Sequence, residues 1–522
     1  MDKSIFKKFF CMLWMVFLIL AGPHIVAAEK EPFVDCGKIM FGVYTDINTM
    51  DPAEAFVWYS TTIARNAYEG LVQYNLKDFS IEPLLAESWK LHEDGGTFHL
   101  RKGVKFQDGT NFDAEAVRFN WQRIMGINKG PATWVKEIKD IKVIDEYTVR
   151  IVTTPKWAFF LDVLAAPWCF LIASPTEVKK HVTADDPWAN KWLHTHTCGT
   201  GPYIAKEWVP NQYITMVRNK DYWKGWAGKH FSEVVYRVVS ETSTRQMLIK
   251  KGEIDLINNI AAEYWDVLDQ DPNITTIVFP SLAQFYFLMN NARGPLTDKN
   301  LRWAVTYAID YEACREAVKA PSSKLVIGPQ FKQDLKKAME YKNKSAYVGK
   351  DVELLLTYVS GSSTHGKLAL IIQDNLKKIG INVKLKSLVW PVFSKEIYGG
   401  NAKEVGDIYA FYAQAVIADS YGTLYKILHS NSTKPGGANL GYSNPKFDAL
   451  LDQAATTIDR DKRMAIYEEA KKLVVDDAVY VWLLMYPFVV IHRDDIKVHP
   501  YTQFGDGVGN IFYFYDLYRD KK

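Results

Sequence analysis

The stretch VELLLTYVSGSSTHGKLALIIQDNLKKIGINVKLKSLVW, Val352–Trp390, decides the fold. An apolar run, a helical repeat and an alternating run follow one another in it, which predicts a strand, a helix and a second strand. Leu368 and Ile372 recur at helical spacing, and Gly380 stands where a helix-ending glycine belongs. Such a unit predicts parallel neighbouring strands, so we expect the α/β class.

The same alternation continues along the chain without an internal repeat. Asp113, and either Thr297 or Asp298, stand where N-caps of helices are expected, and a hairpin is predicted to turn at Asp145-Glu146. The continuous apolar run YVWLLMYPFVVI, 480–491, is typical of a buried strand. With 522 residues, the chain is long enough for two or three domains.

The N-terminus has the pattern of a secretory signal peptide. Three lysines precede an apolar run that Gly22-Pro23 ends, and Val26 and Ala28 are the small residues expected before a cut. We therefore expect cleavage after Ala28 and a periplasmic location. The alternative is an uncleaved membrane anchor.

The composition argues against a nucleic-acid partner and is compatible with a cleft that binds a ligand. The 63 basic and 60 acidic residues give a net charge of +3, so no basic field is present to hold nucleic acid. The 16 Trp, 29 Tyr and 27 Phe suit cores, and also clefts that hold ligands by stacking.

Four cysteines remain after the predicted cleavage: Cys36, Cys169, Cys198 and Cys314. An even number in an oxidising compartment permits disulfides, with three possible pairings. We predict a bond between Cys169 and Cys198, which are nearest in sequence. Free buried thiols are the alternative, because a chain of this size does not need disulfides for stability.

Four separated blocks resemble one family in its expected order, the family 5 extracellular solute-binding proteins. They are LLAESWKLHEDGGTFHLRKGVKFQDGTNFDAEAV (84–117), CGTGPYIAKEWVPNQYITMVRNKDYW (198–223), GPLTDKNLRWAVTYAID (294–310) and IIQDNLKKIGINVKL (371–385). The family comprises the peptide-, nickel- and related solute-binding components of ABC importers. The resemblance spans nearly the whole mature chain.

The resemblance implies a two-lobed periplasmic-binding-protein clamp (type II-like), with an extra domain beside the first lobe and two crossing segments as a hinge. The expected limits are 29–75, 200–282 and 487–522 for lobe I, 76–199 for domain II, and 283–486 for lobe III. Ligand is enclosed as the lobes close, and the closed form docks on an inner-membrane permease. We expect a monomer without a cofactor or a metal.

Gly361–Leu368 follows a predicted strand, opens a helix and fits the pattern G-x-x-x-x-G-K. Leu368 replaces the Ser or Thr that would hold Mg²⁺, which argues against nucleotide hydrolysis. A strand-to-helix turn still presents backbone N–H groups, so His365 and Lys367 are candidates to receive an anionic ligand group. A plain capped helix start is the alternative.

The stretch YAQAVIADSYG, Tyr412–Gly422, is where peptide-binding relatives carry an aspartate for the ligand's amino group. By spacing, Val416 falls at this anchor position, and a valine cannot pair with an ammonium. Either Asp419 takes the role, or the ligand is not held as an ordinary peptide. Asp419 as a helix cap is a further alternative.

Aromatic residues are candidates for the walls of a ligand pocket. Trp390 matches a family tryptophan near the pocket. Further candidates, each of which can equally be a core residue, are Trp58, Tyr286, Tyr412, Tyr421 and Trp482.

These observations predict a binding protein that captures a peptide or peptide-like solute by lobe closure and catalyses no reaction. One alternative is a binder of an oligosaccharide or metal chelate on the same fold. The other is a secreted hydrolase, against which stands the absence of G-x-S-x-G, H-E-x-x-H and C-x-x-C motifs.

Overall fold

The computed structural model describes residues 32–75, 78–258, 260, 262–318, 331–413, 415–434, 437–498 and 512–520. The predicted signal peptide and its cleavage after Ala28 lie outside the described residues. Within the described ranges, no helix combines the length and the apolar character needed to cross a membrane.

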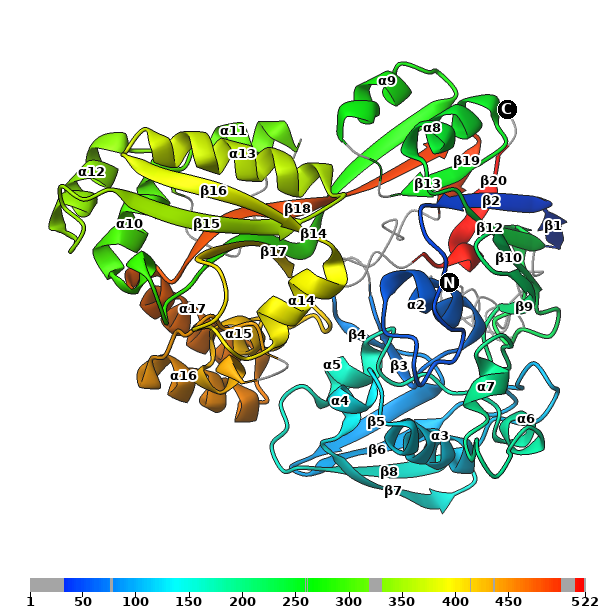
Figure 1. The fold of residues 1–522 in the computed structure, drawn as a ribbon. Helices are drawn as coiled ribbons and strands as arrows, with labels where there is room; N and C mark the ends of the chain where they lie inside the picture. Colours follow the sequence, from blue (N-terminus) through cyan, green and yellow to red (C-terminus); the bar gives the residue numbers. More distant parts are fainter. Residues whose placement is uncertain are drawn as a thin grey trace, which may run out of the picture.

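One sheet of ten strands extends through both halves of the molecule (Figure 1) in the order β16-β15-β17-β14-β18-β13-β2-β12-β10-β9. Its strands are β2 (Lys38–Val43), β9 (Tyr203–Val209), β10 (Tyr213–Arg218), β12 (Glu233–Val238), β13 (Leu256–Asn258), β14 (Ile274–Met289), β15 (Val352–Val359), β16 (Ile381–Leu388), β17 (Ile408–Ala413) and β18 (Tyr480–Arg493). β15 and β16 are parallel, and helix α13 (Ser363–Lys377) connects them, which confirms the predicted strand–helix–strand unit.

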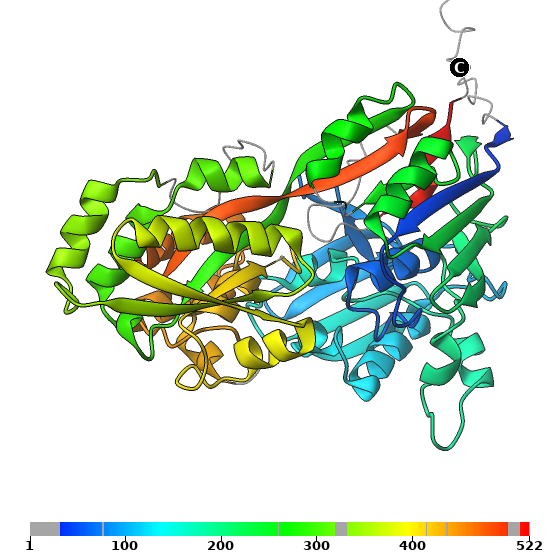
Figure 2. The same cartoon turned by 45° about the horizontal axis from the view of Figure 1, so that its top comes forward.

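Two long antiparallel strands, β14 and β18, run from one half into the other (Figure 2). We use lobe I for the part of the sheet from β13 to β9 with its helices, and lobe III for the part from β16 to β17 with its helices. Both lobes share β14 and β18. The expected limits at 282/283 and 486/487 fall inside these strands; the domain limits themselves stay a prediction.

Domain II is a separate four-stranded antiparallel sheet in the order β5-β6-β8-β7, with helices packed beside it. Its elements are β5 (Ala86–His92), β6 (Gly95–Leu100), β7 (Ile138–Asp145), β8 (Thr148–Thr153), α3 (Ala114–Ile127), α4 (Ala132–Val135), α5 (Phe160–Ala165), α6 (Pro175–Lys180) and α7 (Asn190–Leu193). The hairpin at Asp145-Glu146 forms between β7 and β8 as predicted.

Further elements complete lobe I and the edges of the sheets. They are α2 (Trp58–Ala67), α8 (Thr242–Lys251), η1 (Ala262–Tyr264) and α9 (Trp265–Asp269), with the two-stranded pairs β1 (Phe33–Asp35) and β11 (Gly228–His230), β3 (Val72–Tyr74) and β4 (Ile81–Pro83), and β19 (Ile496–Val498) and β20 (Leu517–Arg519). Two short turns are η2 (Pro295–Thr297) and η4 (Phe514–Asp516).

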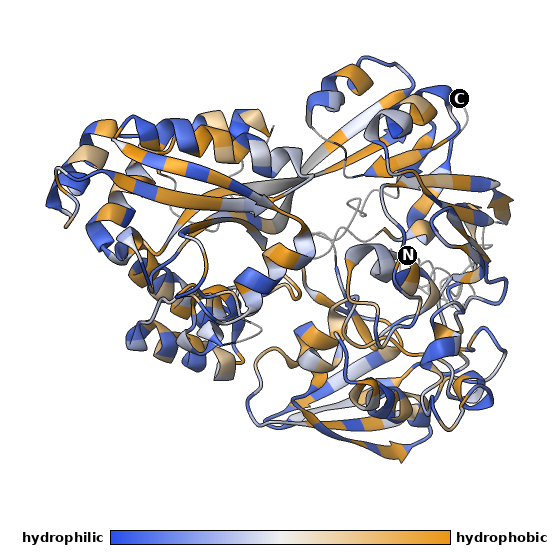
Figure 3. Cartoon of the chain, in the orientation of Figure 1, coloured by the Kyte–Doolittle hydropathy of each residue, from blue (hydrophilic) through white to orange (hydrophobic). Residues whose placement is uncertain are grey.

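Lobe III carries helices around its part of the sheet. They are α10 (Lys299–Ala308), α11 (Tyr311–Ala317), α12 (Leu335–Lys344), α13, α14 (Trp390–Tyr398), α15 (Tyr421–Leu428), η3 (Ser430–Thr433), α16 (Pro445–Thr456) and α17 (Arg460–Asp476). Hydrophobic and hydrophilic residues are interspersed along both the strands and the helices (Figure 3). Separate apolar cores fill lobe III, domain II and lobe I.

Two helices, α3 and α10, begin at N-cap residues that the sequence predicts. Asp113 accepts the N–H of Ala116 at the start of α3, as predicted. Of the two residues proposed to cap α10, Asp298 is the cap, and its carboxylate accepts the N–H groups of Asn300 and Leu301. Because a side-chain oxygen at the N-cap satisfies otherwise unpaired N–H groups, such positions can be predicted locally.

The predicted disulfide between Cys169 and Cys198 is wrong, because both are free buried thiols in the structure. Cys169 lies inside the apolar core of domain II. Cys198 lies beside the charged residues Asp108, Glu177 and Lys180 instead. Proximity in sequence did not bring the two thiols together, since each belongs to a different environment. Burial raises the pKa of Cys198 to about 12, so its thiol stays protonated.

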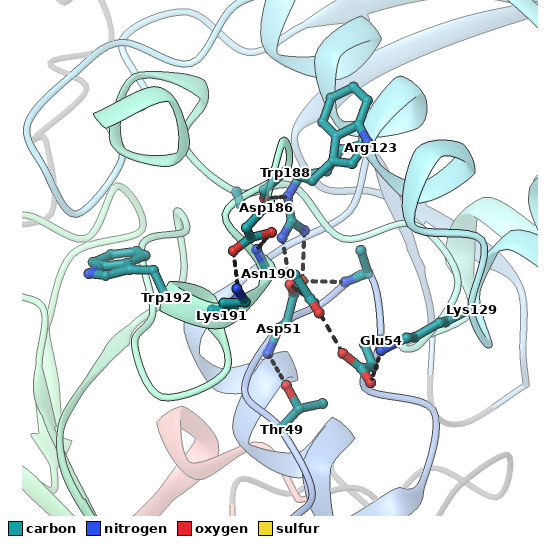
Figure 4. Close-up of polar contacts among 12 residues, drawn as sticks. Thr49, Asp51, Glu54, Arg123, Lys129, Asp186, Trp188, Asn190, Lys191 and Trp192 are labelled. Carbon is teal, nitrogen blue, oxygen red and sulfur yellow. Dashed lines mark hydrogen bonds and ion pairs between the residues drawn. The ribbon is translucent and has the colours of Figure 1, made fainter. Parts of the chain in front are cut away.

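A buried ion pair joins domain II to lobe I (Figure 4). The guanidinium of Arg123, on α3, donates to both carboxylate oxygens of Asp51 at 2.6 and 2.5 Å. The two side chains are 1% and 0% exposed. Asn190 also donates to Asp51, at 2.7 Å. Two parallel charge-assisted hydrogen bonds hold the loop after β2 in a fixed orientation on α3.

Candidate ligand-binding site between the lobes

A segment of lobe III, residues 415–421, packs directly on domain II. Ile417 is fully buried in the apolar core of domain II. The indole N–H of Trp168 donates to the carbonyl oxygen of Val416 at 2.8 Å, and the N–H of Ala418 donates to the hydroxyl of Tyr74 at 3.1 Å. The stretch selected from the sequence for ligand contact therefore also forms an interface between the lobes.

Asp419 is buried and fully engaged within lobe III. Arg463 Nε donates to its Oδ2 at 2.8 Å, and the Tyr467 hydroxyl donates to its Oδ1 at 2.5 Å. The same Oδ1 accepts the N–H of Tyr421, the first residue of α15. The N-cap of α15 is Ser420, so Asp419 is not the cap of this helix, and its carboxylate instead holds the turn that precedes it. These contacts leave little of the Asp419 carboxylate open to an ammonium.

A second carboxylate, Asp162 of domain II, faces this group. It accepts a hydrogen bond from the Tyr74 hydroxyl at 3.1 Å. Burial raises the pKa of Asp162 to about 6; the negative charge of Asp419 adds to the effect, and Arg463 opposes it. A cavity of about 250 Å³ opens beside these residues, lined by both domain II and lobe III, with Trp157 and Arg460 among its walls.

Tyr421 contributes an aromatic contact to the same interface. Its ring stacks on Phe159 of domain II, with 4.5 Å between ring centroids and 27° between the planes. The guanidinium of Arg463 lies 5.4 Å from the centroid of the Phe159 ring. Stacked rings of this kind add to the apolar burial, so Tyr421 stabilises the contact between lobe III and domain II.

The start of α13 has the features of a capped helix. The hydroxyl of Ser362 accepts the N–H of His365. Burial lowers the pKa of His365 to about 4, so the imidazole is neutral near pH 7 and offers no positive charge to an anion. Lys367 pairs with Glu263 of lobe I at 2.8 Å, which links α13 to the short turn η1.

Tyr286 and Trp482 lie on the two long strands β14 and β18. They are opposite each other in the antiparallel register, with 5.1 Å between ring centroids. They are 2% and 3% exposed. Tyr412, on β17, is opposite Phe285 of β14. The structure thus brings three of the predicted wall residues onto adjacent strands where the lobes join.

Trp390 and Trp58 lie on different lobes. Trp390 begins α14 and is 52% exposed, with its ring 5.9 Å from that of Phe393. Trp58 begins α2 in lobe I and is partly buried, with its ring 6.1 Å from that of Tyr44. A shared role of the two tryptophans in ligand binding stays a prediction.

Sequence reasoning missed the residues outside lobe III that lie against the 415–421 segment. Tyr74 of β3, and Phe159 and Trp168 of domain II, contact the 415–421 segment, and Asp162 of domain II lies near enough to Asp419 to feel its charge. None of the four stands in a recognisable motif. Arg463, the buried partner of Asp419, was missed as well. No local signal marks these residues, because each acquires its role only when two distant segments pack together.

Comparison with known proteins places this geometry in a family. Residues 80–435 match the family model described as bacterial extracellular solute-binding proteins, family 5 Middle. The probable D,D-dipeptide-binding periplasmic protein DdpA of Escherichia coli (strain K12) is 29% identical over 516 residues, covering 95% of this chain and 96% of the relative. The glutathione-binding protein GsiB of Salmonella paratyphi A (strain ATCC 9150 / SARB42) is 26% identical over 515 residues, with the same coverage of 95% and 96%.

A solved structure agrees. The periplasmic binding protein DppA of Helicobacter pylori, in complex with the peptide STSA, superposes with a TM-score of 0.75 at 26% identity, and the match covers 93% of this chain and 98% of that one. The two-lobed clamp with its extra domain is therefore the fold. From the family match over most of the chain, together with this fold, it follows that the chain belongs to family 5 of the bacterial extracellular solute-binding proteins.

Proposed function

We propose that the protein captures a peptide or peptide-like solute in the periplasm and delivers it to an inner-membrane ABC permease. The observation that carries the proposal is the pair of strands β14 and β18, which join two lobes whose cores are otherwise separate. Such a connection allows two rigid bodies to swing together around a ligand. The relatives named for dipeptides and glutathione, and the relative solved with a peptide, support this solute class.

Capture requires no covalent step. A ligand that contacts both lobes favours the closed arrangement, because its contacts differ between the open and closed states. Trp390 and Trp58, one on each lobe, are proposed walls for apolar parts of the solute. We propose that the protein acts as a monomer and is not an enzyme. Among the described residues, no cluster of His, Cys, Asp and Glu suited to a metal occurs.

We propose that residues 416–419 do not bind the amino group of the solute. Val416 carries no charge, and Asp419 already pairs with Arg463 and Tyr467. A ligand ammonium would have to break this buried pair, which is costly. We therefore expect N-acetylated peptides to bind about as tightly as free ones.

Native mass spectrometry of the purified protein tests whether a small solute is retained. A thermal-shift panel of Ser-Thr-Ser-Ala, D-alanyl-D-alanine and glutathione, each with its N-acetylated form, then tests the class. Binding raises the midpoint temperature, since it stabilises only the folded state. Failure of every compound to bind would overturn the peptide proposal, and consumption of a bound compound would support the hydrolase alternative. A tenfold or larger loss on acetylation would show that the amine is held after all.

A further inference from the structure

Two buried N–H donors lie unused on the strands that join the lobes, in addition to the hydroxyl of Thr276 on β14. Gln284 of β14 is 4% exposed, and Trp482 of β18 is 3% exposed. Within the part of the chain that the structure describes, neither the amide Nε2 of Gln284 nor the indole Nε1 of Trp482 has a hydrogen-bond partner. Buried donors are rarely left unpaired in folded proteins, so each requires an explanation.

The two donors belong to one group. Trp482 is opposite Tyr286 in the antiparallel register, and Gln284 precedes Tyr286 by two positions. Side chains of opposite residues, and of residues two apart on one strand, share a face of a sheet. The Tyr286 hydroxyl donates to Oε1 of Gln284 at 3.3 Å, which leaves the amide Nε2 as the unused end of that side chain.

The strand register places this group beside the stretch selected for ligand contact. On the other side of β14, β17 pairs so that Ala413 is opposite Gln284. The Tyr412–Gly422 stretch therefore begins one strand away, at a spacing of about 4.8 Å. The donors therefore lie on the two strands that join the lobes.

The chemistry of the neighbours favours a neutral acceptor. Across the three strands, Phe411, Tyr286 and Trp482 form a row of opposite residues, and none of them is basic. Two neutral N–H donors beside aromatic rings suit a carbonyl oxygen. An isolated carboxylate would be held better by arginine, which supplies charge and a bidentate geometry.

We propose that Gln284 and Trp482 donate to one backbone carbonyl oxygen of the bound solute, and so select solutes that carry a peptide bond at the junction of the lobes. This inference rests on the proposed function. Because the donors are satisfied only when the solute is present, the bond favours the ligand-bound closed form over the empty one.

Trp482→Phe tests the proposal, because it removes the N–H and keeps most of the ring. We expect it to weaken binding of Ser-Thr-Ser-Ala, D-alanyl-D-alanine or glutathione, whichever binds the wild type, by roughly tenfold in calorimetry. The midpoint of thermal unfolding of the empty protein should stay the same or rise, since an unpaired donor has been removed. Gln284→Leu should weaken binding by a similar factor.

Trp265→Phe is the matched control. Trp265 of lobe I is also buried, but its indole N–H donates to the carbonyl of Ile260 at 2.9 Å. This variant should lose thermal stability and keep its affinity. Unchanged affinity in both Trp482→Phe and Gln284→Leu, with wild-type binding intact, would overturn the inference while leaving the proposed function standing.

Binding of the carboxyl-terminal amide of Ser-Thr-Ser-Ala tests whether the acceptor oxygen belongs to a backbone carbonyl or to the terminal carboxylate of the solute. If a backbone carbonyl is held, Trp482→Phe weakens binding of the amide and of the free acid by the same factor. If the effect of Trp482→Phe disappears with the amide, the oxygen belongs to the terminal carboxylate, and the assignment to a backbone carbonyl is wrong.

Discussion

Domain II has two interfaces, and they differ in how completely their charges are paired. Against lobe I, Arg123 and Asp51 form a buried two-bond pair, which Asn190 completes. At the interface with lobe III, Asp162 of domain II lies near Asp419, and the pKa of Asp162 is raised. Both charges of the first interface are paired by hydrogen bonds, whereas at the second interface burial and the nearby charge of Asp419 disfavour the ionised form of Asp162.

This difference indicates which parts move together. A buried ion pair that is fully hydrogen-bonded is costly to open, because each charge would lose its partner. Contacts such as the stacked pair of Phe159 and Tyr421, or the single bond from Trp168 to Val416, are worth less and can form and break. Domain II is thus expected to move with lobe I, and lobe III to swing against both.

The largest effect is expected at the first interface. Arg123→Ala leaves Asp51 buried without its cation and should lower the free energy of unfolding by about 3–5 kcal/mol in urea titrations. Arg118→Ala, on the same helix α3, is the control, because Arg118 forms only an exposed pair with Glu115. Its effect should stay within about 1 kcal/mol. Equal effects of the two variants would contradict the distinction between the interfaces.

The contact between domain II and lobe III should depend on pH. The groups that face Asp162 are Tyr74, Asp419, Arg463 and Arg460. Burial, with the negative charge of Asp419, raises the pKa of Asp162 from 3.8 to about 6. The stability that the protonated carboxyl contributes is therefore fully present below about pH 4 and is lost as pH rises through about 6, and we expect the contact with lobe III to weaken over this range. This rise in the pKa of Asp162 corresponds to a free-energy difference between its protonated and ionised forms on the order of 2–3 kcal/mol.

Small-angle scattering between pH 5 and 7.5 measures this response. The wild type should expand as pH rises, while Asp162→Asn, which cannot ionise, should keep one radius of gyration across the range. A wild-type radius that does not change with pH would remove Asp162 as the responsive group.

The smallest effect is expected from the aromatic contact. Tyr421→Ala removes the stack on Phe159 and should shift the balance towards the open form by about 0.5–1.5 kcal/mol. The interlobe distance, measured by energy transfer between labels on domain II and lobe III, reports the shift. Tyr307→Ala is the control, because Tyr307 stacks on Tyr341 within lobe III, and it should change stability without changing the distance.

Much of the fold could be predicted from local patterns. The strand–helix–strand unit of lobe III, the cap Asp113 and the hairpin at Asp145-Glu146 depend on residues close in sequence, so their signals survive in a single chain. The predicted disulfide was wrong because nearness along the chain says little about the surroundings of two side chains.

The sequence by itself determined the α/β class, the resemblance to a family and the stretch from Tyr412 to Gly422 as a place of interest. Only the tertiary structure decided that Asp419 pairs with Arg463 and that the donors of Gln284 and Trp482 lie unused at the junction of the lobes. The reason is physical: whether a polar group has a partner depends on residues far away in sequence, which meet only after folding.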